Sequence, residues 1–245
     1  MSARPVSAVA RATVRAVARA TVRVAALLLA AAASACAQGV QRVPAGLGAR
    51  AADSVTADSV RKASRSGLPP AGFGTLHQSD IALAIQNFGV TISAIPLDES
   101  VLRALAPDSY RSLRDLRDSK SKRLMEIQTR LGLTSVQAWY VTFFIVDLGE
   151  ARFDAGDLLL RSAGRDFRPI DILGLKPGWG DGRLAQKGVQ SAIYVFDPAV
   201  DLTQPITMSA AGQQTSSWSD NLQRIERERA LAWSRASAAT VPKKP

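Results

Sequence analysis

The chain has little of the chemistry on which most enzymes depend, because its 245 residues include one cysteine and one histidine. A single cysteine excludes an intramolecular disulfide framework and a metal site built from several cysteines. A single histidine excludes every metal centre that needs more than one, including the HExxH class. Neither a G-x-S-x-G nucleophile elbow nor a phosphate-binding glycine motif occurs. The lone His77 precedes the first expected strand, and we expect it at the surface of the domain.

Acidic residues are missing from the first 35 residues, which carry five arginines. These arginines account for half of the formal net charge of +10. The remainder of the chain is only moderately basic, so its net charge gives little support for binding to a polyanion. We expect no nucleic-acid partner.

The N-terminus has the features of an export signal. The basic stretch is followed by ten apolar residues from Val24 to Ala33 and then by small residues. A positive region, a short apolar region and small residues at the cleavage site define a secretory signal peptide. Ten helical residues rise only about 15 Å, too little to cross a bilayer. We therefore assign residues 1–35 to a signal peptide.

The end of this signal, Ala33-Ser34-Ala35-Cys36, resembles the lipobox of bacterial lipoproteins. It departs from that pattern at Ala33, where the family usually has leucine. The resemblance covers the signal alone and implies that Cys36 carries the lipid that anchors the protein to a membrane. Two alternatives stay open. Cleavage after Ala37 would give a soluble secreted protein, and the repeated RATVR of 11–15 and 19–23 would also suit an organellar presequence.

The composition divides the rest of the chain into three parts. Residues 36–72 are rich in alanine, glycine, serine and proline and lack aromatic residues. Such a segment buries too little apolar area to offset the entropy of ordering its backbone, so we expect a flexible tether. Residues 73–235 are expected to form a single globular domain, and 236–245 a disordered tail.

The hydrophobic pattern of the domain predicts an α+β fold. Expected strands cover 80–85, 89–95, 136–146, 157–161, 167–175, 189–196 and 205–209. The segment 136–146 is apolar on both faces and is expected to be a central strand covered on both sides. The segment 205–209 is expected at an edge. Because helices do not alternate with the strands, an antiparallel β-sandwich-like domain is favoured over a Rossmann-type fold.

Three helices are expected, at 98–106, 107–131 and 217–234. The second is an amphipathic insert that starts at Pro107 and stops before Gly132, the usual placement of these residue types at helix ends. Its apolar stripe is interrupted at Lys120. The third is the C-terminal helix, which we expect to dock on the sheet through Trp218 and Trp233. Trp139, Tyr140, Phe143 and Phe144 in the central strand are expected in the core.

The inserted helix carries a basic face that includes Arg111, Arg114 and Lys122. Acidic residues are interleaved with these cations, and Asp118–Lys122 and Glu126–Arg130 have the spacing of helical ion pairs. A solvated surface of ion pairs is the leading interpretation. The functional alternative is contact with anionic lipid or with an anionic envelope polymer.

Two loops provide the remaining candidate sites. The glycine-rich segment 174–182 is expected to be a hairpin loop, and its functional interpretation is a recognition loop that displays Lys176 and Trp179. Four acidic residues, Asp147, Glu150, Asp154 and Asp157, follow the central strand. They lack the EF-hand spacing, and acids are common at strand ends. We therefore expect no metal ion, no cofactor and no catalytic residue.

These observations favour a cell-envelope lipoprotein whose β-rich domain is a non-catalytic binding or assembly module. Its expected partners are the membrane, through the lipid on Cys36, and an envelope protein or anionic polymer. The alternative is a secreted or periplasmic hydrolase that uses the loop carboxylates. The sequence leaves the ligand and the oligomeric state open.

Overall fold

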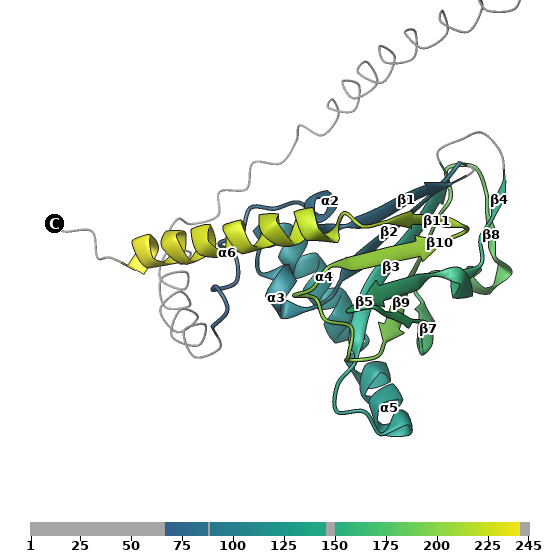
Figure 1. Ribbon diagram of the computed structural model, residues 1–245, viewed down its shortest axis with the longest axis horizontal. Helices are drawn as coiled ribbons and strands as arrows, with labels where there is room; N and C mark the ends of the chain where they lie inside the picture. Colours follow the sequence, from purple (N-terminus) through teal and green to yellow (C-terminus); the bar gives the residue numbers. More distant parts are fainter. Residues whose placement is uncertain (1–66, 88, 146–149, 241–245) are drawn as a thin grey trace, which may run out of the picture. The chain divides into compact units, whose positions relative to one another are not determined.

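The computed structural model describes residues 67–87, 89–145 and 150–240 (Figure 1). They form an α+β fold with antiparallel sheets and a C-terminal helix, which confirms the predicted fold class. The signal peptide, Cys36, most of the tether and Asp147 lie outside the described residues. No helix in the described part of the chain is long and apolar enough to span a membrane.

The larger sheet has five strands in the order β1-β2-β3-β9-β7. Their bounds are Leu83–Asn87, Val90–Pro96, Gln137–Ile145, Val189–Phe196 and Asp171–Gly174. The strand β3 is central, as predicted, because its apolar alternation buries Trp139, Val141 and Phe143 on one face. Its other face is not fully covered, since Phe144 remains 37% exposed. The expectation that β3 is covered on both sides is therefore wrong at this end.

The second sheet has four strands in the order β11-β10-β5-β6, and a third pairs β4 with β8. The bounds of the four strands are Gln213–Thr215, Ile206–Ala210, Leu159–Ser162 and Arg165–Phe167. Those of the pair are Ala151–Arg152 and Arg183–Leu184. The strand β10 pairs on both sides, so the prediction of an edge strand at 205–209 is wrong. The segment predicted as one strand at 167–175 divides between the end of β6 and β7.

Two short helices precede and follow the first two strands of the larger sheet. The helix α2, Gln78–Ile81, occupies the beginning of a segment predicted as strand, 80–85. The helix α3, Glu99–Leu102, begins after Asp98, whose side chain accepts a hydrogen bond from the amide of Ser100. This cap satisfies an amide that the helix itself leaves without a partner.

The predicted insert 107–131 is two helices, α4 at Pro107–Ser119 and α5 at Ser121–Leu131. Lys120 separates them with φ −108° and ψ 5°, outside the helical region. The break coincides with the interruption of the apolar stripe, which the prediction of one continuous helix did not take into account. Pro107 starts α4, and Gly132 ends α5 in the left-handed conformation with φ 66°, as their positions predicted.

The C-terminal helix α6 extends from Trp218 to Thr240. It is longer than predicted and includes part of the expected tail, because Ala236 is fully buried. Trp218 is also fully buried, and its ring lies 5.9 Å from that of Trp139. The Nε1 of Trp218 donates to the carbonyl of Leu202 at 3.0 Å. The expected docking through Trp218 is confirmed, while Trp233 is only half-buried.

Polar contacts fix the rest of α6 to the start of the domain. Glu228 is buried, and its Oε1 accepts from the backbone amide and hydroxyl of Thr75 and from Arg235. Arg235 also donates to the carbonyl of Phe73. Pro69 is buried and its carbonyl accepts from Arg103, so the folded domain begins several residues earlier than the predicted boundary at 73.

Candidate functional site

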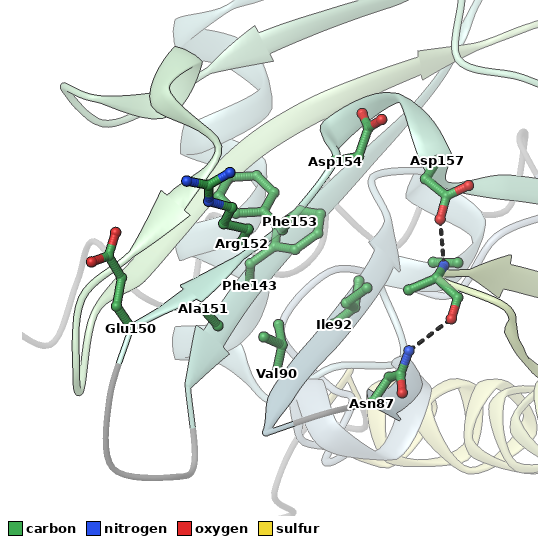
Figure 2. Close-up of a pocket in the computed structure, with 12 residues that line it drawn as sticks. Asn87, Val90, Ile92, Phe143, Glu150, Ala151, Arg152, Phe153, Asp154 and Asp157 are labelled. Atoms are coloured by element: carbon green, nitrogen blue, oxygen red, sulfur yellow. Dashed lines mark hydrogen bonds between the residues drawn. The ribbon is translucent and has the colours of Figure 1, made fainter.

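A pocket of about 390 Å³ lies where the larger sheet meets β4 and the turn between β10 and β11 (Figure 2). Its floor is apolar and includes Val90, Ile92 and Phe143, each at most 7% exposed. Ile92 and Phe143 are partners across the β2–β3 pair, which places both side chains on the same face. Figure 1 shows β4 and β8 at the end of β1 and β2 that lies away from α2 and α3. The pocket is therefore distant from the place where the chain enters the domain.

A group of aromatic rings supports the floor from behind. The ring of Phe143 lies 4.5 Å from that of Phe153 and 5.7 Å from that of Trp179. Trp179 also contacts Tyr194, with 6.2 Å between the ring centroids. A side chain at Gly174 would approach the indole of Trp179 to 2.7 Å, so glycine at this position lets the indole pack inward. These contacts make the floor a rigid apolar surface.

One wall of the pocket is held by polar contacts to Ala211. Asn87 donates from Nδ2 to the carbonyl of Ala211 at 2.7 Å. The amide of Ala211 donates to Oδ2 of Asp157 at 2.5 Å. Ala211 has φ 50°, a conformation that costs a residue with a side chain some energy. The two hydrogen bonds hold the turn in this conformation (Figure 2).

Asp154 organises the next stretch of the rim. Its Oδ1 accepts from the amide of Gly156 at 2.8 Å and thereby starts the short 3-10 helix η1 at Ala155–Asp157. The hydroxyl of the buried Tyr194 donates to the carbonyl of Ala155 at 2.7 Å. Burial raises the pKa of Tyr194, and the negative charge of Asp154 raises it further. Tyr194 is therefore a neutral hydrogen-bond donor at physiological pH.

The remaining rim residues carry opposite charges. Glu150 lies 3.8 Å from Arg183 of β8, and both side chains are well exposed. Arg152 is exposed and forms no ion pair within the described residues. Solvent screens charges in such positions, so they contribute little to the stability of the fold. They remain available to a ligand.

Two of the rim carboxylates hold the backbone turns that border the pocket. The carboxylates of Asp154 and Asp157 each accept a hydrogen bond from a backbone amide that a turn requires. No group of histidine, cysteine, aspartate and glutamate in the described residues has the geometry of a metal site. The lone His77 is exposed, and its amide donates to Asp80 at the start of α2.

The structure brings together three of the four predicted acidic residues, Glu150, Asp154 and Asp157, at one pocket. It separates the two residues of the predicted recognition loop. Lys176 is exposed, with its Nζ 3.1 Å from the carbonyl of Val189. Trp179, in the 3-10 helix η2 at Trp179–Asp181, is half-buried among the aromatic rings. The loop therefore displays the lysine and not the tryptophan.

The basic face has a different set of ion pairs from the one predicted. Asp118 lies 3.6 Å from Arg114 instead of pairing with Lys122. Glu126 pairs with Arg123 at 2.9 Å, and Arg130 reaches across to Asp171 of β7 at 2.8 Å. Both predicted pairs are wrong, because each acid has a closer cation on the other side. Arg111 lies 3.7 Å from Asp108, whereas Lys122 forms no ion pair in the described residues.

Sequence reasoning missed Asn87, Phe153 and Ala211. Apolar alternation in the expected strands gave the floor, but no periodic signal links Asn87 to a turn more than a hundred residues away. A second hollow lies over the four-stranded sheet and is lined mostly by polar side chains. Among them, Arg161 and Asp166 form a bidentate ion pair. The hydrogen bonds that Arg161 donates to the carboxylate of Asp166 lower the pKa of Asp166.

Comparison with known proteins gave no match to a family model, to a curated protein or to a solved structure.

Proposed function

We propose that the protein is a lipid-anchored protein of the cell envelope, and that its domain binds a ligand in the pocket between β2, β3, β4 and the β10–β11 turn without transforming it. The export signal and Cys36 support the first part of this proposal. The pocket supports the second, because its volume and its apolar floor with a polar rim are typical of small-ligand sites.

One observation carries the non-catalytic interpretation. Two of the three rim carboxylates are hydrogen-bonded to backbone amides, Asp154 to Gly156 and Asp157 to Ala211, while the third, Glu150, lies 3.8 Å from Arg183. These hydrogen bonds give Asp154 and Asp157 a role in holding the turns of the rim, which supports a binding site more directly than a hydrolase. The apolar floor around Phe143 then offers binding energy for an apolar group.

The position of the pocket agrees with this function. The chain enters the domain at Pro69, beside α3, while the pocket lies at the far ends of β1 and β2. A domain held by its N-terminal side would present the pocket away from its attachment point.

The binding proposal is tested with phenylnaphthylamine, a neutral fluorescent probe that brightens in an apolar environment. Ala151 is half-buried in β4 and lines the pocket, so Ala151→Trp fills it. Ala230→Trp makes the same change on an exposed face of α6 and is the matched control. We expect saturable binding of one probe to the wild type and to Ala230→Trp, and no binding to Ala151→Trp. Equal titrations of all three proteins would contradict binding at this pocket.

A further inference from the structure

The corner between α4 and α5 carries positive charge that no acid neutralises. Among the described residues, the side chains of Arg117, Lys120 and Lys122 form no ion pair. We call these three residues the basic corner. The other cations of the two helices each lie beside an acid, at 2.8 to 3.7 Å: Arg111, Arg114, Arg123 and Arg130. One exposed acid of α4, Asp115, likewise forms no ion pair in the described residues, so the unpaired cations of this surface outnumber its unpaired acids.

An apolar side chain lies next to the basic corner. Met125 is 57% exposed, and it follows Lys122 by three positions on α5, so the two share one side of the helix. The opposite side of α5 buries Leu124 and Ile127 in the domain. A single apolar side chain beside unpaired cations suits a surface contact with an anionic membrane, in which the domain stays folded and only Met125 enters the headgroup region.

Lys122 is exposed, whereas Arg117 and Lys120 are half-buried. Figure 1 shows α5 at the periphery of the domain, with no other labelled element on its outer side. The chain enters the domain beside α3, where Arg103 contacts Pro69, and α4 follows directly. The thirteen residues of α4 rise about 20 Å, so the corner lies within about that distance of the start of α4.

We propose that the basic corner and Met125 form a contact surface for a bilayer that contains anionic phospholipid. Charge complementarity favours this occupant, because each cation near an anionic surface strengthens binding about fivefold. Met125 would enter the headgroup region beside Lys122. This contact would fix the orientation of the domain on the membrane. It does not depend on the lipid at Cys36, and the test removes that lipid.

The test uses the mature chain with Cys36→Ser, which contains no cysteine. Adding Met125→Cys creates a single attachment point for a dye whose emission shifts to the blue in an apolar environment. Ala230→Cys, exposed on α6, is the matched control. Vesicles of phosphatidylcholine alone and vesicles that also contain phosphatidylglycerol are added to both labelled proteins.

We expect a blue shift at position 125 with the anionic vesicles only, and no shift at position 230. Changing Arg117, Lys120 and Lys122 together to glutamine should weaken cosedimentation with anionic vesicles at least about tenfold. The control changes three other cations without an ion pair in the described residues to glutamine: Arg168, Lys187 and Arg227. This triple substitution should change cosedimentation with anionic vesicles less than about twofold.

Three results would overturn the proposal: no shift at position 125 with anionic vesicles, equal shifts at both positions, or equal weakening by the two triple substitutions. A shift produced by soluble polyglutamate in place of vesicles would assign the surface to an anionic polymer and would also overturn it. Exchanging lysine for arginine and arginine for lysine at the basic corner keeps the charge. That variant should bind anionic vesicles as the wild type does, and weaker binding would count against a charge-based contact.

Discussion

Two acidic residues at the pocket, Asp154 and Asp157, each accept a hydrogen bond from a backbone amide in a turn. Asp157 joins Ala211, a residue 54 positions away, through a hydrogen bond on the surface. We predict that Asp154→Ala and Asp157→Ala each lower the free energy of unfolding by about 1 kcal/mol, the usual effect of losing one such bond. Urea denaturation measures this change. Asp157→Asn keeps a side-chain oxygen that can accept the hydrogen bond, so it should lower the free energy of unfolding by less than Asp157→Ala does.

The same substitutions test the hydrolase alternative. Asp147, which lies outside the described residues, belongs to this series. We expect each single alanine variant to retain the biological activity of the protein once its amount of folded protein is equalised. Loss of activity in one variant, with both thermal stability and probe binding unchanged, would identify a catalytic carboxylate and contradict a non-catalytic function.

Tyr194 makes the fold sensitive to alkaline pH. Burial raises its pKa in the folded protein, whereas in the unfolded chain the phenol titrates near its ordinary value of about 10. The unfolded state therefore releases this proton first as the pH rises. The stability from Tyr194 is fully present below about pH 10 and is lost as the pH rises towards the folded pKa.

We predict that urea unfolding measured between about pH 8 and pH 11 shows falling stability at the alkaline end. Tyr194→Phe should flatten this decline, although it also loses the hydrogen bond to Ala155. The decline should not vanish, because burial and the charge of Glu99 also raise the pKa of Tyr110. An unchanged decline in Tyr194→Phe would contradict this assignment.

At the scale of elements, α6 completes the core of the domain. Trp218 is fully buried, contacts Trp139 and donates to Leu202. We predict that Trp218→Ala lowers the free energy of unfolding by about 3 to 5 kcal/mol, the range for removing a large buried aromatic side chain. Leu231→Ala on the same helix, at a position that is 51% exposed, should change it by less than about 0.5 kcal/mol. Thermal and urea unfolding measure the stability of both variants. Similar losses of unfolding free energy in Trp218→Ala and Leu231→Ala would contradict the docking role of Trp218.

The elements that the sequence predicted well are those with a strong local signal. Apolar alternation predicted β2, β3 and β9, and Pro107 and Gly132 predicted the outer ends of α4 and α5. The predictions were wrong where contacts between residues distant in sequence determine the local structure. Apolar residues in 80–85 suited a strand, yet Asp80 bonds to the amide of His77 and Arg224 of α6 donates to the carbonyl of Asp80, which hold this stretch as α2.

The candidate site was predictable only in part for the same reason. The inward position of Phe143 follows from the alternation of β3, and the acidic residues after β3 were evident as a group. Trp179 was misplaced because its inward packing depends on the close approach of Gly174, which no spacing reveals. The wall at Ala211 depends on Asn87 and Asp157, which are distant in sequence, so only the folded chain shows it.

In the whole molecule, we propose two separate functional features, a ligand pocket in the domain and a lipid anchor at its N-terminal side. The described domain presents a pocket at one end of β1 and β2, and the export signal together with Cys36 would hold its N-terminal side at a membrane. The basic corner would add a second, non-covalent contact. If the anchor is absent but the pocket binds its probe, the domain is still a binding module, acting in solution.

Anchoring of the mature protein through Cys36 is tested by measuring the mass and the location of the protein in cells. Intact mass and membrane partition are determined for the protein recovered from cells, with wild type and Cys36→Ser compared. The account predicts a chain that begins at Cys36 with a lipid-sized mass increment, found in the membrane fraction, and release of the Cys36→Ser protein from that fraction in salt. An unmodified wild-type chain that begins at Gln38 and stays in the soluble fraction would contradict it.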